Sequence, residues 1–242
     1  MNFTLMIDSM PALLRGTVVT IQLLAVTLTL GMALAVPLAI LRVQRAPLLS
    51  WPVRAYIYFF RGTPLLVQIF LFYYGLAQFD AVRESLFWPY LRQPYVCALL
   101  TFVLHTAAYT ANILRGAMEA VPAGEVEAAR ACGMRPAQVY RLILLPRAFR
   151  LGLPAYSNEV IGMLKGTSLA STVTVMELTG VANTIVAQSF SPYEIFVAAA
   201  LIYLAITFVL TRALALVEHH WSRHMRPVDV PAAKVGQEEA HA

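Results

Sequence analysis

Long apolar runs separated by short polar stretches dominate the chain. The first uncharged run extends from Gly16 to Leu41, and a transmembrane helix needs about 20 apolar residues. Four further runs of sufficient length follow, at 53–79, 93–114, 151–169 and 193–211. The pattern predicts an all-α, polytopic membrane protein with five transmembrane helices. A half-apolar segment at 170–191 precedes the fifth run and has no clear place in this scheme.

Composition supports the membrane interpretation. Of 242 residues, 59% are hydrophobic and 13% are charged, whereas an average soluble domain is about 45–50% apolar and about 25% charged. An ordinary water-soluble enzyme is therefore excluded, and so is a disordered chain, which would be poor in apolar residues. The two cysteines, Cys97 and Cys132, lie in different surroundings and indicate neither a disulfide framework nor a metal cluster.

The arginines and lysines predict the orientation in the membrane. They are concentrated after the first and third apolar runs and in the tail, and they are sparse near the N-terminus and after the second run. Because cytoplasmic loops carry the excess of Lys and Arg, we expect the N-terminus outside and the C-terminus in the cytoplasm. Basic residues spread between apolar runs are not a nucleic-acid-binding patch. The chain is expected to form one domain, 1–226, followed by a disordered tail, 227–242.

The longest hydrophilic loop, 121–136, has a helix–glycine–helix pattern. Pro122 ends the preceding helix, and Glu125 and Glu127 open a short run of good helix formers. Gly133 then ends that helix and Pro136 begins the next one. Composition alone favours a solvated connection between two spans over the alternative, a docking surface for a partner.

The same loop resembles the EAA loop of binding-protein-dependent ABC transporter permeases. The family pattern is Glu-Ala-Ala, three residues, Gly, nine residues, and Ile-x-Leu-Pro. This sequence has it at every defined position, in residues Glu127, Ala128, Ala129, Gly133, Ile143, Leu145 and Pro146. The resemblance implies that the loop is a coupling helix, which docks into a cleft of a cytoplasmic ATPase subunit.

Two further stretches narrow the resemblance. Residues 60–68, Phe-Arg-Gly-Thr-Pro-Leu-Leu-Val-Gln, and 153–160, Leu-Pro-Ala-Tyr-Ser-Asn-Glu-Val, are similar to polar amino acid permeases of the histidine/lysine/arginine/ornithine or opine type, in particular to the M-type half. The resemblance implies a type I ABC importer permease fold in the bacterial inner membrane. It also implies three partners: a cytoplasmic ABC ATPase dimer, a second, homologous permease and a periplasmic amino-acid-binding protein. His105 departs from the family pattern, in which we expect a smaller polar residue.

ATP hydrolysis is not expected in this subunit. A phosphate-binding loop requires Gly-Lys followed by Ser or Thr, and neither of the two lysines, Lys165 and Lys234, fits that pattern. ATP and Mg are therefore expected on the partner ATPase, with no cofactor and no metal in this chain. No nucleophile motif or paired carboxylates indicate an enzyme.

Ionisable residues within the fourth run mark a candidate substrate pathway, because each costs about 2.5–3.5 kcal/mol at the centre of a membrane helix. Glu159, beside Asn158, either faces a water-filled pathway and pairs with a cationic substrate, or is a structural carboxylate bonded to neighbouring helices. Lys165 lies six residues further on, which is 240° around a helix, so the two side chains do not pair within it. Lys165 either extends to the membrane surface or meets a substrate carboxylate.

Thr63 and Gln68 form a second candidate wall. Gly62 and Pro64 can interrupt the helix there, which at membrane depth is tolerated beside a cavity; a packing kink is the alternative. His105 either gates the pathway or is hydrogen-bonded by a neighbouring helix. A contrasting hypothesis, an ATP-independent channel or secondary transporter, would use these groups as an ion relay, but the chain lacks the inverted repeats such folds often show.

Overall fold

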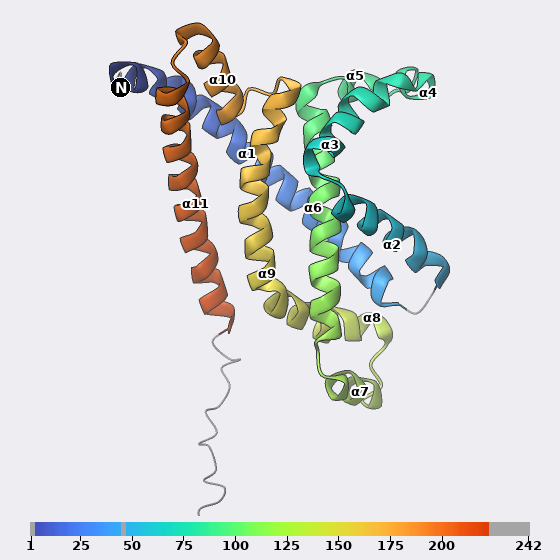
Figure 1. Ribbon diagram of the computed structural model, residues 1–242. Coiled ribbons are helices and arrows are strands. Elements are labelled where there is room, and N and C mark those ends of the chain that lie inside the picture. The colour runs from blue at the N-terminus through green and yellow to red at the C-terminus, as the bar shows by residue number, and fades with distance from the viewer. Residues whose placement is uncertain (1–2, 45–46, 223–242) are drawn as a thin grey trace, which may run out of the picture.

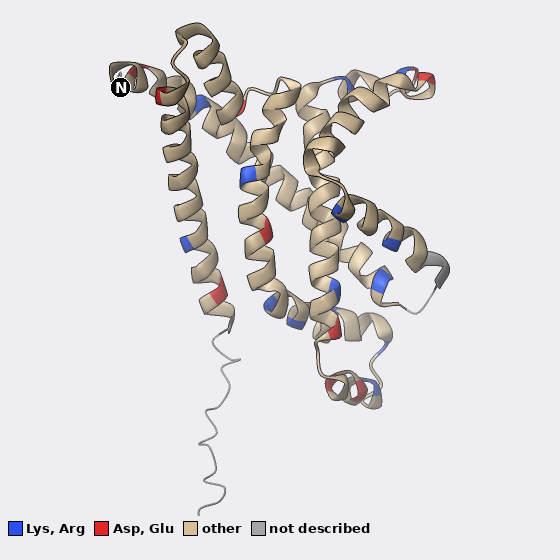
Figure 2. Ribbon diagram, in the orientation of Figure 1, with Lys and Arg blue, Asp and Glu red and all other residues tan. Residues whose placement is uncertain are grey.

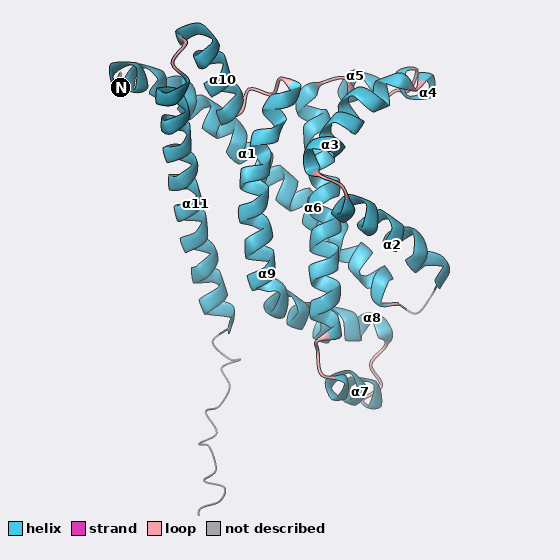
Figure 3. Ribbon diagram, in the orientation of Figure 1, coloured by secondary structure: helices cyan, strands magenta, loops and turns pink. Residues whose placement is uncertain are grey.

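The computed structural model describes residues 3–44 and 47–222, and within these ranges every regular element is helical (Figures 1 and 3). Three long helices dominate: α1 (Phe3–Val43), α6 (Pro94–Glu119) and α11 (Pro192–Ser222). The remaining elements are α2 (Pro47–Gly62), α3 (Leu65–Phe70), η1 (Leu71–Gly75), η2 (Leu76–Gln78), α4 (Asp80–Arg83), α5 (Trp88–Leu91), α7 (Ala123–Ala131), α8 (Pro136–Val139), η3 (Tyr140–Leu144), α9 (Leu145–Gly166), η4 (Thr167–Val173) and α10 (Leu178–Ser189). The all-α prediction is confirmed.

Helices α1 and α6 pack closely because small residues lie where they cross. Ala35 and Ala39 of α1 and Ala108 and Ala111 of α6 are fully buried in one hydrophobic cluster. A Cβ added to Gly31 would lie 2.9 Å from Thr106 Cγ2. Small side chains allow this approach of two backbones, which is how helices associate inside a membrane.

The predicted second span is broken where the sequence indicated. Helix α2 ends at Gly62, and Pro64 takes an extended conformation before α3. The helix direction bends by 111° between the two halves, Ser50–Gly62 and Leu65–Gln78. Proline lacks the N–H that would continue the helix. The interruption predicted from Gly62 and Pro64 is thus confirmed, as a sharp bend in an otherwise apolar pair.

The half-apolar segment 170–191 forms two elements. The short 3-10 helix η4 continues α9, and Thr174, at φ 66°, turns the chain toward α10. A second bent pair consists of the stretch from α8 to η4, Pro136–Val173, and helix α10, Leu178–Ser189. The bend between them is 47°. Figure 1 shows α10 beside the N-terminal part of α1, at the opposite end of the bundle from α7 and α8.

The number of spans follows from these breaks. Three helices are long and apolar enough to cross a membrane by themselves, and up to five spans result if each bent pair is one span. Long stretches of α1, α6 and α11 carry no charged residue (Figure 2). Apolar side chains on the outer surface of α11, including Leu204, Phe208 and Leu216, are more than half exposed. This outer surface suits contact with lipid. The predicted tail, 227–242, lies outside the described residues.

Candidate functional site

The predicted coupling loop forms two helices joined by a tight turn. Helix α7 ends with the amide of Gly133 donating to Arg130 O at 2.9 Å and the amide of Met134 donating to Ala129 O at 3.1 Å. Gly133 has a φ of +79°. These two hydrogen bonds and the left-handed residue define a Schellman motif, in which glycine is strongly favoured. The helix–Gly133–helix prediction is confirmed in its local geometry.

The motif residues divide into an outward and an inward set. Glu127, Ala128, Gly133 and Pro146 are exposed, whereas Ala129 is 5% exposed, and Ile143 and Leu145 are half-buried in the same hydrophobic cluster. The buried set holds the loop against the long helices, and the exposed set leaves one face available to a partner.

A groove of about 820 Å³ runs beside this face and is lined by apolar side chains and by charged ones of both signs, among them Glu119, Glu127 and Arg130. On the other side of α7, Arg147 of α9 donates to Glu125 at 2.8 Å. This ion pair joins the first turn of α7 to the start of α9, the helix that carries Glu159.

The bend between α2 and α3 is fixed by Gln68, which is 1% exposed. Its amide nitrogen donates to Phe60 O at 2.8 Å and to Thr63 O and Oγ1 at 2.9 and 2.8 Å. Its oxygen lies 2.9 Å from Nδ1 of His105 on α6. Thr63, Gln68 and His105, predicted separately along the pathway, therefore form one hydrogen-bonded cluster that satisfies the carbonyls freed by the bend.

The cluster continues through aromatic and charged groups toward the fourth predicted span. The His105 ring stacks on Tyr109 with centroids 4.6 Å apart, and the Arg61 guanidinium lies 5.4 Å from the centroid of the same Tyr109 ring. Arg61 also attracts the Glu159 carboxylate electrostatically. Arg61 thus belongs to the His105 cluster and attracts Glu159 without contacting it, a role that sequence reasoning did not assign to it.

The remaining pathway candidates stand apart from this cluster. Asn158 and Lys165 are exposed, and Glu159 is half-buried. Within the described chain, none of these three side chains makes a hydrogen bond or a salt bridge. Among the described residues, no group of three or more His, Cys, Asp or Glu side chains could hold a metal ion.

Sequence reasoning also missed Glu177. It is fully buried just before α10, and its carboxylate accepts hydrogen bonds from the Gly180 amide at 2.8 Å and from Tyr203 of α11 at 2.9 Å. Thr20 of α1 donates to it at 3.3 Å. An acidic residue followed by a helix-forming run is an N-cap signal, but the segment around Glu177 was too weakly apolar to be assigned.

These features define the class of protein: an all-helical membrane protein with a polar cluster between its helices and an outward-facing helix–glycine–helix at one end. The family model described as "binding-protein-dependent transport system inner membrane component" matches residues 27–223. The chain belongs to this family and is a permease subunit of an ABC importer.

Three similar proteins illustrate the relationship. The octopine transport system permease protein OccM of Rhizobium meliloti is 48% identical over 229 residues, covering 92% of this chain and 93% of OccM. The histidine/lysine/arginine/ornithine transport system permease protein HisM of Escherichia coli strain K12 is 42% identical over 213 residues, covering 88% and 90%. A crystal structure of an amino acid ABC transporter with histidines superposes with a TM-score of 0.80 at 30% identity, covering 91% of this chain and 99% of that one.

Proposed function

We propose that this permease translocates polar, basic amino acids or opines into the cell by alternating access. The names of its relatives, which include octopine and histidine/lysine/arginine/ornithine permeases, support this substrate class. The half-buried Glu159, next to Asn158 and without a hydrogen-bonding partner among the described residues, supports a pathway for a cationic group. Thr63, Gln68, His105 and Lys165 are the further pathway candidates.

The observation that carries the transport mechanism is the outward face of α7. Glu127, Ala128 and Gly133 are exposed, while Ala129 and the Arg147–Glu125 pair tie the helix to the spans behind it. A partner ATPase that closes on this face would move α7, and α9 would follow. ATP and Mg bind to that partner, so this subunit is a transport component rather than an enzyme.

The assembly we propose has four kinds of component besides lipid: this subunit, a second homologous permease, a cytoplasmic ATPase dimer and a periplasmic binding protein. This subunit crosses the inner membrane five times as one domain, 1–226, with its N-terminus outside and its C-terminus in the cytoplasm. The two bent helix pairs support the count of five, and the arginines near α7 support the orientation.

Replacement of Gly133 tests the coupling role. Gly133→Val forces a β-branched residue to φ +79°, which disrupts the turn between α7 and α8. We expect uptake into proteoliposomes to fall at least about tenfold, while the ATPase keeps its basal hydrolysis and loses its stimulation by the binding protein. Gly116→Val is the matched control, since no atom lies within 4 Å of a Cβ added there. Normal uptake and normal stimulation of ATP hydrolysis in Gly133→Val would show that α7 is not the coupling helix.

The dependence on ATP separates this function from an ion-driven transporter or a channel. Uptake that stops when ATP is depleted, with the membrane potential maintained, supports the importer. Uptake that continues would favour the ATP-independent alternative. Mass spectrometry of proteins that co-purify from native membranes identifies the partners: an ATPase with a second permease supports a heterodimeric pathway, and an ATPase alone supports a homodimer.

A further inference from the structure

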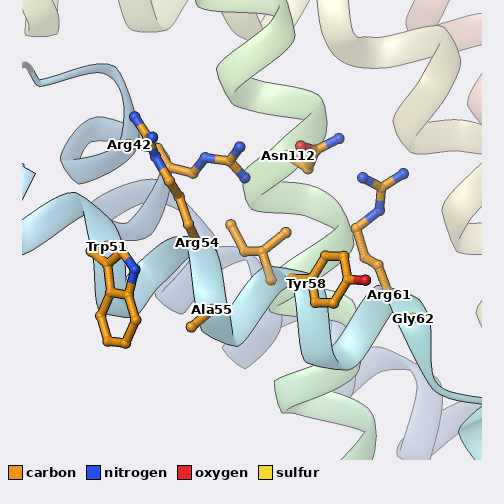
Figure 4. Close-up of a pocket in the computed structure, with 9 residues that line it drawn as sticks. Arg42, Trp51, Arg54, Ala55, Tyr58, Arg61, Gly62 and Asn112 are labelled. Carbon is orange, nitrogen blue, oxygen red and sulfur yellow. The ribbon is translucent and has the colours of Figure 1, made fainter.

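A pocket of about 650 Å³ lies between the end of α1, helix α2 and helix α6, away from the coupling face, and it shares Arg61 with the polar cluster around His105. Three arginines line it: Arg42 from α1, and Arg54 and Arg61 from α2. Figure 4 shows Arg54 and Arg61 rising from α2 to the side on which Arg42 and Asn112 lie. We call this site the arginine pocket.

The positive charge of the arginine pocket is only partly balanced by the described chain, in which Glu159 attracts Arg61. Arg42, Arg54 and Arg61 form no salt bridge with any described residue. Arg54, Arg61 and Arg115 all repel the charge of Arg42. Glu119 attracts it, but the Glu119 carboxylate already accepts from Arg115 at 2.6 and 2.8 Å. An anion bound between the arginines would relieve this repulsion.

The chemistry of the donors favours a phosphate group. Guanidinium groups present planar pairs of N–H donors that match phosphate oxygens, and they lose less hydration than an ammonium group would. Asn112 adds an amide to the same wall. A cationic amino acid, the substrate class proposed above, would be repelled, so the arginine pocket is unsuited to hold it.

The surroundings favour a phosphate that belongs to a lipid. Trp51 and Tyr58 line the pocket and are 73% and 83% exposed, and such aromatic side chains are enriched at the membrane–water interface. Val43, directly after Arg42, packs in the same hydrophobic cluster as Ala129 of α7. The pocket therefore lies toward the α7 end of the bundle, where basic sites between membrane helices bind anionic headgroups.

We propose that the arginine pocket binds the headgroup of an anionic phospholipid and so links α1, α2 and α6 on the side that faces α7. We place this headgroup in the cytoplasmic leaflet because the proposed function puts α7 on the cytoplasmic side of the membrane. This part of the proposal therefore rests on the proposed function. The binding itself does not require ATP, substrate or a binding protein.

Binding of phosphatidylglycerol tests the proposal. The full chain, purified with the subunits that accompany it, is placed in phosphatidylcholine nanodiscs, and retained phosphatidylglycerol is measured by native mass spectrometry during titration. Each basic residue near an anionic membrane surface contributes about a fivefold gain in affinity, so the triple variant R42Q/R54Q/R61Q is expected to bind on the order of a hundredfold more weakly. The control R15Q/R83Q/R92Q removes three exposed arginines elsewhere and should bind as the wild type does.

Each outcome decides the question. Equal binding by the triple variant and the control overturns the site, and displacement of phosphatidylglycerol by excess inorganic phosphate overturns the lipid as its occupant. If the triple variant does not fold, Arg54→Gln alone should weaken binding about fivefold, and unchanged binding in that variant overturns the proposal. ATP-dependent uptake is measured separately, so a chain that binds phosphatidylglycerol without such uptake would contradict only the proposed function.

Discussion

Two carboxylates in the second half of the chain have opposite surroundings. Glu177 lies fully buried where α1, α10 and α11 meet, and it accepts hydrogen bonds from Gly180, Tyr203 and Thr20. Thr20 in turn accepts from the Leu178 amide at 3.1 Å. The donors come from three helices, so the group joins them. Every oxygen of this carboxylate has a partner.

Glu159 lies on α9, half-buried, and its carboxylate makes no hydrogen bond or salt bridge with a described residue. The attraction of Arg61 acts on it from α2. A carboxylate at membrane depth is costly, and the protein offsets that cost for Glu177 but leaves Glu159 largely without compensation. We infer from this difference that Glu177 stabilises the fold, and we propose that Glu159 is available to a ligand.

The largest effect on stability is expected for Glu177→Ala. The change removes three acceptor interactions and leaves the Gly180 amide and the Tyr203 hydroxyl without their partner, which should cost about 3 kcal/mol. We expect a lower melting temperature of the purified protein in detergent and less protein in the membrane. Glu84→Ala, at an exposed loop residue, is the control and should melt as the wild type does. An unaltered melting temperature in Glu177→Ala would show that the Glu177 carboxylate does not stabilise the fold.

A smaller loss is expected for Gly180→Ala, which perturbs the same junction without touching the carboxylate. An added Cβ would lie 2.2 Å from Val175 O, so the backbone must shift. This shift should lower the free energy of unfolding by about 2 kcal/mol. In the matched variant Gly162→Ala on α9, no atom lies within 4 Å of the added Cβ. Because alanine has the higher helix propensity, the free energy of unfolding should rise by up to about 1 kcal/mol. Thermal unfolding of both variants is the measurement. Equal melting temperatures would show that the α10 junction is not tightly packed.

Sequence reasoning succeeded for the α7 turn, for the break between α2 and α3, and in singling out Glu159. The α7 turn was predictable because its causes are local: Pro122 and Pro136 bound the helices, and Gly133 supplies the positive φ. The break at Gly62–Pro64 was predictable for the same reason. Glu159 was noticed because a charge interrupts a long apolar run.

Glu177 was missed because its role depends on tertiary contacts. Its partners Thr20 and Tyr203 lie 157 and 26 residues away in the chain, and nothing in the local pattern connects them. The pairing of Gln68 with His105 across 37 residues is a second case. Each residue was identified from its polarity within an apolar run, but their hydrogen bond depends on how α3 packs against α6.

An intermediate effect is expected for Gln68→Leu. The leucine fills the space but leaves the carbonyls of Phe60 and Thr63 and the Nδ1 atom of His105 without the amide. We expect the free energy of unfolding to fall by about 1–2 kcal/mol. The loss should be smaller than for Glu177→Ala, because no charged group is involved. Thermal unfolding measures it, with Gln78→Leu, at an exposed residue, as control. A melting temperature equal to that of the control would mean that Pro64 alone fixes the bend.

The smallest effect on stability and the clearest effect on transport are expected for Glu159→Gln. Since the carboxylate has no hydrogen-bonding partner among the described residues, neutralising it should lower the free energy of unfolding by no more than about 0.5 kcal/mol. If Glu159 pairs with the cationic group of the substrate, uptake of arginine should fall by about tenfold or more, whereas uptake of a neutral analogue such as citrulline, where the wild type accepts it, should fall much less. Glu159→Asp, which keeps the charge, should retain part of the arginine uptake. A melting temperature lowered as far as in Glu177→Ala would instead make Glu159 a second structural carboxylate, because only a group with partners in the fold can destabilise the protein to that extent when it is neutralised.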